Sequence, residues 1–462
     1  MLKKILLRTL LFLFILIVGG LLTFLIANWR DQDLRPEVKS ALNWQAPKVL
    51  DEANAYLLVL GLNAKEGIDP VTLGARKLNA ELARYEKNRY LTVDFAESVN
   101  DPDELTFVKP KSQVCEYAET ANCVAFYLAR SAEQEQEILK SQHILLANFD
   151  RLTVSKTYQE IAPPHIAASI PSYASVMHAA ELERMRAIRL IANGKVAQGL
   201  EQLLLLASFS QRWLENSSSL VSHMVALASV QRDLRICDEL LQRFPNLQRE
   251  IDPMQDWMNQ FSMQRMHIAK AFAFERQVGM NIMQSTLALP EEVQDAKLQQ
   301  RLIKWFNRPN AAMNMSYDWY NVRLNLLEKS GQEYFASRTE VEKKQKELLG
   351  IGTDSFYLRD PFTKNLLSIS APDYDVYIEK HYDTFAQIHL LALKLDLLKQ
   401  GIPRNEIPAY IQKHAAQYSN PFDGKVLGWD AEHQQLFVEL RQASNQVYQK
   451  SKMMRLNVLP RA

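Results

Sequence analysis

An uncharged apolar run between residues 9 and 27 is the feature that most constrains this chain. As an α-helix the run would be about 28 Å long, which matches the roughly 30 Å hydrocarbon layer of a bilayer. The sequence therefore predicts one membrane-spanning helix. No second apolar run in the sequence approaches this length, so a channel or transporter made by this chain alone is disfavoured.

The charges that flank this run predict its orientation. Lys3, Lys4 and Arg8 precede it, whereas the residues just after it carry balanced charges. Because positively charged flanks stay in the cytoplasm, residues 1–8 are expected inside the cell. The bulk of the chain is then expected outside, in the periplasm of a bacterial-type envelope, with the run acting as a single-pass signal-anchor in the inner membrane.

A cleaved signal peptide is the competing interpretation, since it also has a charged start and an apolar middle. The apolar segment is longer than a signal peptide requires. The best cleavage point, after Ala27, has Leu25 where a small residue is needed, and no lipoprotein cysteine follows. We therefore expect the run to be retained as an anchor.

Composition favours a helical body and makes nucleic acid an unexpected partner. The 462 residues are 47% hydrophobic and 23% charged, and their net charge of +1 lacks a basic footprint. Gly (14) and Pro (18) are scarce, whereas helix-favouring residues are abundant. The expected fold is mainly α, with an irregular helical-hairpin domain and a small C-terminal α+β part that contains short β-hairpins.

The cysteines indicate one disulfide. Cys115 and Cys123 lie close together at the edge of a proline-containing loop, and an oxidising compartment would allow them to pair. Closing so short a loop would contribute about 2.5 kcal/mol in the chain-entropy model. A metal site would need more ligands than two thiols. Cys237 falls on an apolar helical stripe and is expected to be a small buried hydrophobe.

Apolar residues recur at helical spacing over much of the chain before residue 350. Three prolines between residues 161 and 171 mark the clearest interruption. Caps and glycine or proline breaks then delimit the expected helices, which cover residues 51–62, 70–87, a hairpin within 121–158, 172–192, 196–215, 220 to just before Pro245, 252–289, and a region from 309 to about 349.

Two stretches near the C-terminus predict β-hairpins. The first has a strand at residues 366–370, a turn at Pro372 and a strand at residues 374–378. The second has strands at residues 426–429 and 435–438 around a turn. Both follow an Asx-Pro-Phe segment, and together they predict a sheet of about four strands.

Three regions resemble known proteins. Residues 194–200 resemble the turn and second-helix start of a tetratricopeptide repeat, with Gly199 where that family usually has Ala and without a second copy. The Pro-Phe-Asp-Gly-Lys segment at 421–425 resembles a terminal hairpin of exported bacterial proteins, some of them pilin-like, although Pro36 and Pro47 interrupt the helix that a pilin would continue. The helices between 172 and 244, together with the long loop-interrupted part that follows them, resemble uncharacterised membrane-anchored bacterial proteins over about half of the chain. This resemblance implies no catalytic residues.

These features divide the chain into an expected order of parts. The order is a cytoplasmic tail (1–8), the anchor (9–27), a connector (28–50), a helical and loop region with the disulfide (51–160), a helical-hairpin domain (161–350) and a small α+β region (351–462).

Motifs for catalysis or cofactor binding do not occur in the sequence. It contains no Gly-x-Ser-x-Gly, Ser-x-x-Lys, His-Glu-x-x-His, EF-hand, P-loop or Gly-x-Gly-x-x-Gly motif. We therefore predict no cofactor and no metal. His178 with Glu181 could orient a general base, and His381 with His389 could face one side of a helix, but ordinary helix contacts explain both pairs.

Two further groups of residues permit a functional or a structural interpretation. Four aspartates around the first predicted hairpin could form a catalytic or Ca²⁺ site, although aspartates are common in turns. Methionines between residues 254 and 283 could bind a soft metal or line a ligand groove, although core packing is the commoner role. The residues are Asp354, Asp360, Asp373 and Asp375, and Met254, Met258, Met263, Met266, Met280 and Met283.

The sequence thus favours a membrane-tethered interaction protein over an enzyme. Its expected partners are the lipid bilayer, through the N-terminal helix, and another envelope protein. Two alternatives stay open. One is an envelope enzyme whose site assembles from dispersed residues such as His381 and the aspartates, and the other is a carrier of a hydrophobic ligand along the methionine-rich helix.

Overall fold

The computed structural model describes residues 2–46, 51–88, 101–108, 113–117, 120, 122–266, 268–287, 308–350, 359–370, 374–441 and 452–458. Most of this part of the chain is helical, and a small antiparallel sheet lies near the C-terminus. The prediction of a mainly α fold with short C-terminal strands is confirmed.

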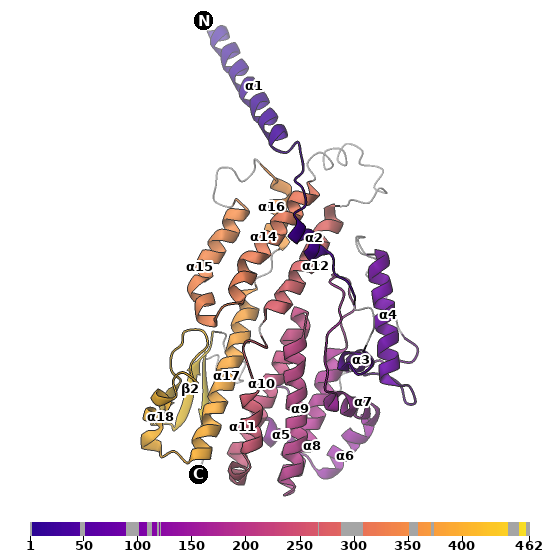
Figure 1. Cartoon of the computed structure of the whole chain (residues 1–462), viewed down its shortest axis with the longest axis vertical. Helices are drawn as coiled ribbons and strands as arrows, with labels where there is room; N and C mark the ends of the chain where they lie inside the picture. The colour runs from indigo at the N-terminus through magenta and orange to yellow at the C-terminus, as the bar shows by residue number, and fades with distance from the viewer. Residues whose placement is uncertain are drawn as a thin grey trace.

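Helix α1 (Leu2–Ala27) projects from one end of the domain (Figure 1). Large apolar side chains along it, such as Leu11, Phe14 and Ile26, are exposed. By length and composition, the segment Lys4–Ala27 is the one helix among the described residues that could cross a membrane.

Helices of 6 to 19 residues follow α1 along the chain. Asn54 caps α3 (Ala55–Leu60), the helix expected to begin at residue 51, because its side chain accepts a hydrogen bond from the Tyr56 N–H. The Asp51 carboxylate instead accepts from the Ala53 N–H in the preceding turn. The elements are α2 (Pro36–Leu42), α3 (Ala55–Leu60), α4 (Pro70–Asn88), α5 (Cys123–Leu128), α6 (Ala132–Ser141) and α7 (His143–Val154).

Three long helices form the centre of the domain, close to their predicted boundaries. Gly194, with φ of +80°, provides the left-handed turn between the first two, and the Ser219 hydroxyl caps the third. A Cβ on Gly199 would lie 2.7 Å from the Ala187 carbonyl oxygen, so glycine allows the first two helices to approach closely. The helices are α8 (Tyr173–Ala192), α9 (Val196–Asn216) and α10 (Leu220–Arg243).

The predicted continuous helix from residue 252 to 289 is wrong, because the chain turns after Asn259. Met254 and Trp257 pack in one core and Phe272 and Met280 in another, and the turn lets the chain pass between the two. A regular helical spacing of apolar residues does not reveal such a change of partner. The elements are η1 (Pro245–Arg249), α11 (Asp252–Asn259) and α12 (Ala269–Leu287).

The first predicted C-terminal hairpin is also wrong, because residues 366–370 lie in a helix and a second helix begins at Asp375. On the second of these helices, Ile378, Tyr382 and Phe385 are buried at helical spacing. Gly401, with φ of +61°, ends that helix. The short apolar runs at 366–370 and 374–378 match a strand over five residues but belong to longer helical patterns. The elements are α14 (Pro309–Leu327), α15 (Gly331–Leu348), α16 (Pro361–Ser370) and α17 (Asp375–Gln400).

The second predicted hairpin is confirmed. Its strands pair antiparallel with Trp429 opposite Leu436, and a third strand adds to the other side, so the sheet has three strands in the order β1-β2-β3 rather than about four. Leu436 and Val438 face the helices and are buried. The elements are η3 (Arg404–Glu406), α18 (Ile407–Lys413), β1 (Gly428–Asp430), β2 (Gln435–Glu439) and β3 (Met453–Asn457).

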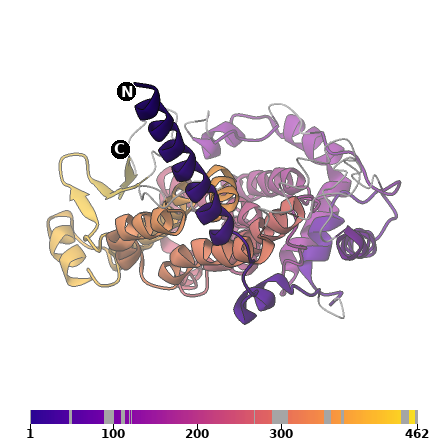
Figure 2. The ribbon, with the colours of Figure 1, turned by 90° about the horizontal axis from the view of Figure 1, so that it is seen from above.

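Buried apolar side chains form two cores. The main core joins α3, α5, α7 to α11, the second half of α17 and the sheet. The anchor-side core is smaller and joins α2, α12, α14, the first residues of α15 and the start of α17. Viewed from above, α1 crosses over the anchor-side helices, with the sheet on one flank and α3 to α7 on the other (Figure 2).

Candidate functional site

The junction between α1 and the domain is the first candidate site. Helix α14 begins at Pro309, and the side chain of the preceding residue, Arg308, does not cap it. The Asp31 carboxylate takes that place, because its oxygens accept hydrogen bonds from the backbone N–H groups of Asn310 (2.9 Å) and Ala311 (3.0 Å). A carboxylate at a helix N-terminus satisfies free N–H groups and complements the helix dipole.

Arg35 forms a second connection to α14. Its guanidinium donates to the Asn314 carbonyl oxygen (2.9 Å) and to the Asp318 carboxylate (2.5 Å). In return, the Asn314 amide donates to the Asp33 carbonyl oxygen at 3.0 Å and to the Gln32 side chain at 3.3 Å. The segment after α1 is therefore bound along the first three turns of α14.

A buried ion pair closes the junction. Arg308 contacts the Asp360 carboxylate at 2.9 Å, and both residues are at most 4% exposed. Arg308 also donates to the Ala27 carbonyl oxygen at the end of α1 (3.4 Å), and the Asn28 side chain accepts from the Asp360 N–H (3.0 Å). Burial raises the pKa of Asp360 above its ordinary value, although the Arg308 charge opposes this rise. The end of α1 is thus held by the domain itself.

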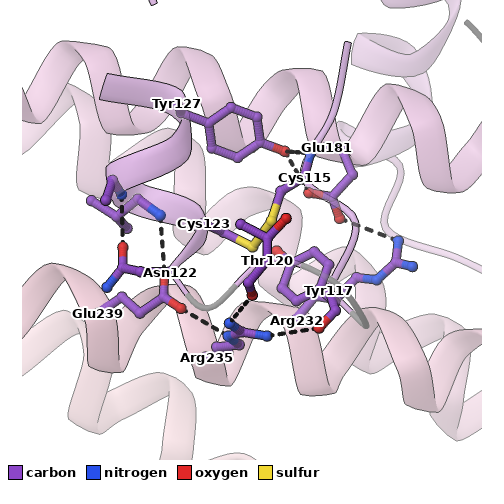
Figure 3. Close-up of a disulfide and its surroundings, with 12 residues drawn as sticks. Cys115, Tyr117, Thr120, Asn122, Cys123, Tyr127, Glu181, Arg232, Arg235 and Glu239 are labelled. Atoms are coloured by element: carbon purple, nitrogen blue, oxygen red, sulfur yellow. Dashed lines mark hydrogen bonds and ion pairs between the residues drawn. A yellow bond between two sulfur atoms is a disulfide. The ribbon is translucent and has the colours of Figure 1, made fainter. Parts of the chain in front are cut away.

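The disulfide is the second candidate site (Figure 3). The structure joins Cys115 to Cys123, with Cα atoms 5.6 Å apart. The Tyr127 hydroxyl accepts from the Cys115 N–H (3.0 Å) and donates to Glu181 on α8 (2.8 Å). Burial raises the pKa of Tyr127, so this hydroxyl stays protonated as a donor. On the other side, Glu239 on α10 accepts from the Val124 N–H (2.9 Å).

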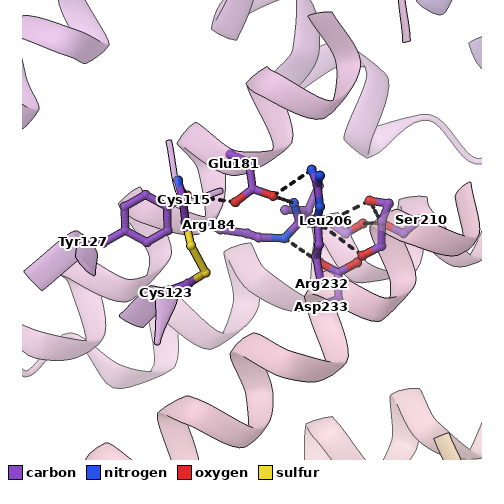
Figure 4. Close-up of polar contacts among 10 residues, drawn as sticks. Cys115, Cys123, Tyr127, Glu181, Arg184, Leu206, Ser210, Arg232 and Asp233 are labelled. Carbon is purple, nitrogen blue, oxygen red and sulfur yellow. Dashed lines mark hydrogen bonds and ion pairs between the residues drawn. A yellow bond between two sulfur atoms is a disulfide. The ribbon is translucent and has the colours of Figure 1, made fainter. Parts of the chain in front are cut away.

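Beneath the disulfide lies a cluster of buried charges (Figure 4). The fully buried Arg184 on α8 contacts Asp233 on α10 at 2.6 Å and Glu181 at 2.8 Å. Arg232 also reaches Glu181, at 3.2 Å. Burial alone would lower the pKa of Arg184, but the nearby carboxylates raise it above its ordinary value. We call these four residues the Arg184 cluster.

The Arg184 cluster can orient helices but offers no chemistry to a ligand. Its two arginines and two carboxylates balance in charge, and Arg184 and Asp233 are closed to solvent. The Ser229 hydroxyl and carbonyl oxygen both accept from Arg184, at 3.1 and 3.2 Å. A buried pair of this kind fixes the relative position of the helices more than it stabilises them.

The histidines that the sequence offered as possible site residues make separate contacts. Glu181 is bound by Tyr127, Arg184 and Arg232, whereas the His178 ring packs against Phe107 with centroids 5.5 Å apart. The Glu181 carboxylate therefore accepts hydrogen bonds from residues other than His178.

On α17 the two histidines point to separate partners. His381 Nδ1 lies 3.1 Å from His223 Nε2 on α10, and His389 Nδ1 lies 2.7 Å from the Ser419 carbonyl oxygen. Burial lowers the pKa of His389. His223 was not predicted, although its place between Leu220 and Leu227 on the buried stripe of α10 could have indicated it.

Of the four aspartates considered as a cluster, the two that the structure describes belong to separate ion pairs. Asp354 and Asp373 lie outside the described residues. Asp360 belongs to the junction, and Asp375 contacts Arg323 at 2.6 Å and Arg338 at 2.9 Å. Within the described ranges, no group of three His, Cys, Asp or Glu side chains could hold a metal ion.

Five of the six predicted methionines are buried, and Met263 packs against both cores from a partly exposed position. Met254, Met258 and Met266 belong to the main core, and Met280 and Met283 to the anchor-side core. Their thioethers fill space between helices, which is the core-packing role that the sequence also allows.

Comparisons with known proteins find no match for this chain. No family model matches it, and neither the curated proteins nor the solved structures include a match. The resemblances to tetratricopeptide repeats, to exported hairpins and to membrane-anchored bacterial proteins therefore stay predictions.

Proposed function

We propose that the protein is a single-pass membrane-tethered scaffold, whose helical domain lies on the outer side of the cytoplasmic membrane and binds another envelope protein. The observation that carries this proposal is the junction. Asp31, Arg35 and Arg308 connect the end of α1 to the domain by hydrogen bonds and ion pairs. A domain held at a fixed angle to its anchor can present a surface at a defined height above the bilayer.

Charge and redox chemistry both support this orientation. Lys3, Lys4 and Arg8 precede the apolar helix, and positive flanks favour the cytoplasmic side. The disulfide lies in the domain at the other end of α1, and disulfides persist in oxidising compartments such as the periplasm. The two arguments are independent, and they agree.

The arrangement of polar residues favours a scaffold over an enzyme. The histidines and aspartates considered for catalysis are distributed over separate contacts, and Asp360 and Asp375 are each paired with arginine. Arg184 and Asp233, which are both fully buried, pair with each other. These side chains therefore position helices.

Photocrosslinking in cells tests the proposal. A photoreactive residue is placed at exposed positions of the full-length protein in its native membrane, such as Tyr377 and Val221. A discrete crosslinked partner from the envelope is expected at some positions. A C-terminal alkaline phosphatase fusion should be active, because that enzyme requires an oxidising compartment. Phosphatase inactivity with fluorescence of a matched C-terminal GFP fusion would contradict the orientation, and the absence of any crosslinked envelope protein would contradict the scaffold role.

A further inference from the structure

An open cleft lies on the anchor-side core, between α2, α12 and α14. Its volume is about 510 Å³, within the range of pockets that hold small organic ligands. None of the methionines considered above lines it. The lining used in the argument consists of Ser40, Ala41, Trp44, Phe274, Arg276 and Tyr317.

Arg276 gives this cleft its chemistry. The guanidinium lies 4.7 Å from the centre of the Tyr317 ring and donates to the Asn321 side chain at 2.5 Å. Among the described residues, its buried Nε has no hydrogen-bond partner, and no carboxylate is among the charges that act on it. Burial lowers the pKa of Arg276, as expected for a cation without a nearby counterion. A ligand oxyanion in the cleft would supply the counterion that this guanidinium lacks.

The rest of the lining suits the apolar part of an amphiphile. Trp44, Phe274 and Tyr317 present aromatic surface beside the guanidinium. Aromatic rings cover alkyl chains and also border the bilayer interface in membrane proteins. The acid in the lining, Glu37, lies 3.4 Å from the Arg35 guanidinium, so its charge is partly balanced.

The cleft also lies close to the bilayer surface. Asp31, four residues beyond the end of α1, is bonded to Asn310 in the first turn of α14. Tyr317 follows Asn310 by seven residues, which is about 10 Å along a helix. The headgroup layer on each side of a bilayer is about 5–8 Å deep. A headgroup therefore reaches the cleft only when its phospholipid moves outward from the leaflet by at least a few ångström.

We propose that this cleft binds the headgroup of an anionic phospholipid from the adjacent leaflet. Arg276 donates to the phosphate oxygens, while the aromatic residues cover the glycerol and the first acyl carbons. The volume and the aromatic lining favour a lipid over inorganic phosphate, which would leave most of the cleft empty. The inference rests on the membrane tether proposed above.

Native mass spectrometry of the full-length protein tests the proposal. The protein is released from nanodiscs that contain equal amounts of phosphatidylglycerol and phosphatidylcholine. The wild type is expected to retain one phosphatidylglycerol in preference to phosphatidylcholine. Arg276→Gln should reduce this retention by about tenfold, the loss expected for a charge-assisted hydrogen bond. Arg249→Gln, at an exposed arginine on η1, is the matched control and should retain the lipid.

A second variant fills the cleft without removing the charge. Ser40 is exposed at the cleft, so Ser40→Trp should fold normally and also lose the lipid. Equal retention in wild type, Arg276→Gln and Ser40→Trp would overturn the proposal. So would a preference for phosphatidylcholine.

A control with inorganic phosphate distinguishes binding of a lipid phosphate group from binding of free phosphate. With phosphate alone and no lipid, no stable adduct is expected. A phosphate adduct that depends on Arg276 and displaces phosphatidylglycerol would assign the cleft to a soluble anion and overturn the lipid proposal. The fusion reporters described above report on the tether and its orientation independently of this binding assay.

Discussion

The two cores of the molecule have different structural roles. In the main core, apolar packing encloses the Arg184 cluster, and the disulfide closes a short loop above it. In the anchor-side core, the main ion pairs lie at helix ends, where Arg308, Asp360 and Asp31 meet the end of α1. One core therefore fixes how helices pack, and the other fixes where the domain lies relative to α1.

The largest loss of folding stability is predicted for a substitution at Arg184. Arg184→Met should leave Asp233 buried without its counterion, which costs about 3–5 kcal/mol. Urea unfolding of the protein in detergent should show the loss in the transition of the main core. Arg243→Met, at an exposed residue on α10, should have little effect. The double variant Arg184→Met/Asp233→Leu should recover much of the lost stability, and a single-variant loss below about 1 kcal/mol would contradict the importance of the cluster.

The disulfide is expected to have the next largest effect. The double variant Cys115→Ser/Cys123→Ser should lose about 2.5 kcal/mol in the free energy of unfolding, because the unfolded chain gains freedom. Dithiothreitol should lower the stability of the wild type by a similar amount and leave the double variant unchanged. Equal sensitivity of both proteins to the reductant would contradict the pairing.

Asp31 tests the anchor-side core. Asp31→Ala removes the cap of α14 and should cost about 1 kcal/mol. Hydrogen exchange should accelerate in the first turn of α14 and remain unchanged in α8 and α10, so the effect separates the two cores. Asp33→Ala, at an exposed side chain, is the control. Unchanged exchange near Asn310 in the Asp31 variant would contradict the capping role.

A small pH effect is expected at the hairpin turn between β1 and β2, at the edge of the main core. Hydrogen bonds from the His433 N–H and side chain and from Arg455 hold the pKa of Asp430 at about 2, below its ordinary value of 3.8. A carboxyl with a lowered pKa stabilises the folded state above its ordinary pKa, and the contribution is lost as the pH falls toward the folded-state value. Asp430→Asn should therefore lower the thermal midpoint slightly at pH 5 and not at pH 2. A difference that grows on acidification would contradict this.

The sequence predicted the elements whose signals are local. The helices around Gly194 and Ser219 and the hairpin around Asp430 each have a turn or cap residue next to a clear period of apolar residues. These interactions form between near neighbours in the chain, so they can be read without the fold.

The remaining features depend on contacts between distant residues. The Asp31 cap on α14 joins positions 279 residues apart, and Arg184 pairs with Asp233 across two helices. The runs at 366–370 and 374–378 match strands over a short window, and the packing of Ile378 and Tyr382 makes the second run helical. The missing cap before Pro309 was a usable signal, since a helix start without its own cap often takes one from elsewhere.

The distance between α1 and the domain tests the central claim most directly. Spin labels at Ile17→Cys and Asn325→Cys can be measured by double electron–electron resonance in nanodiscs. Both positions are exposed, Cys115 and Cys123 are paired, and Cys237 is buried. The account predicts one narrow distance distribution that broadens in Asp31→Ala/Arg308→Ala. A broad distribution in the wild type, unchanged by that variant, would show a flexible linker and contradict a domain fixed to its anchor.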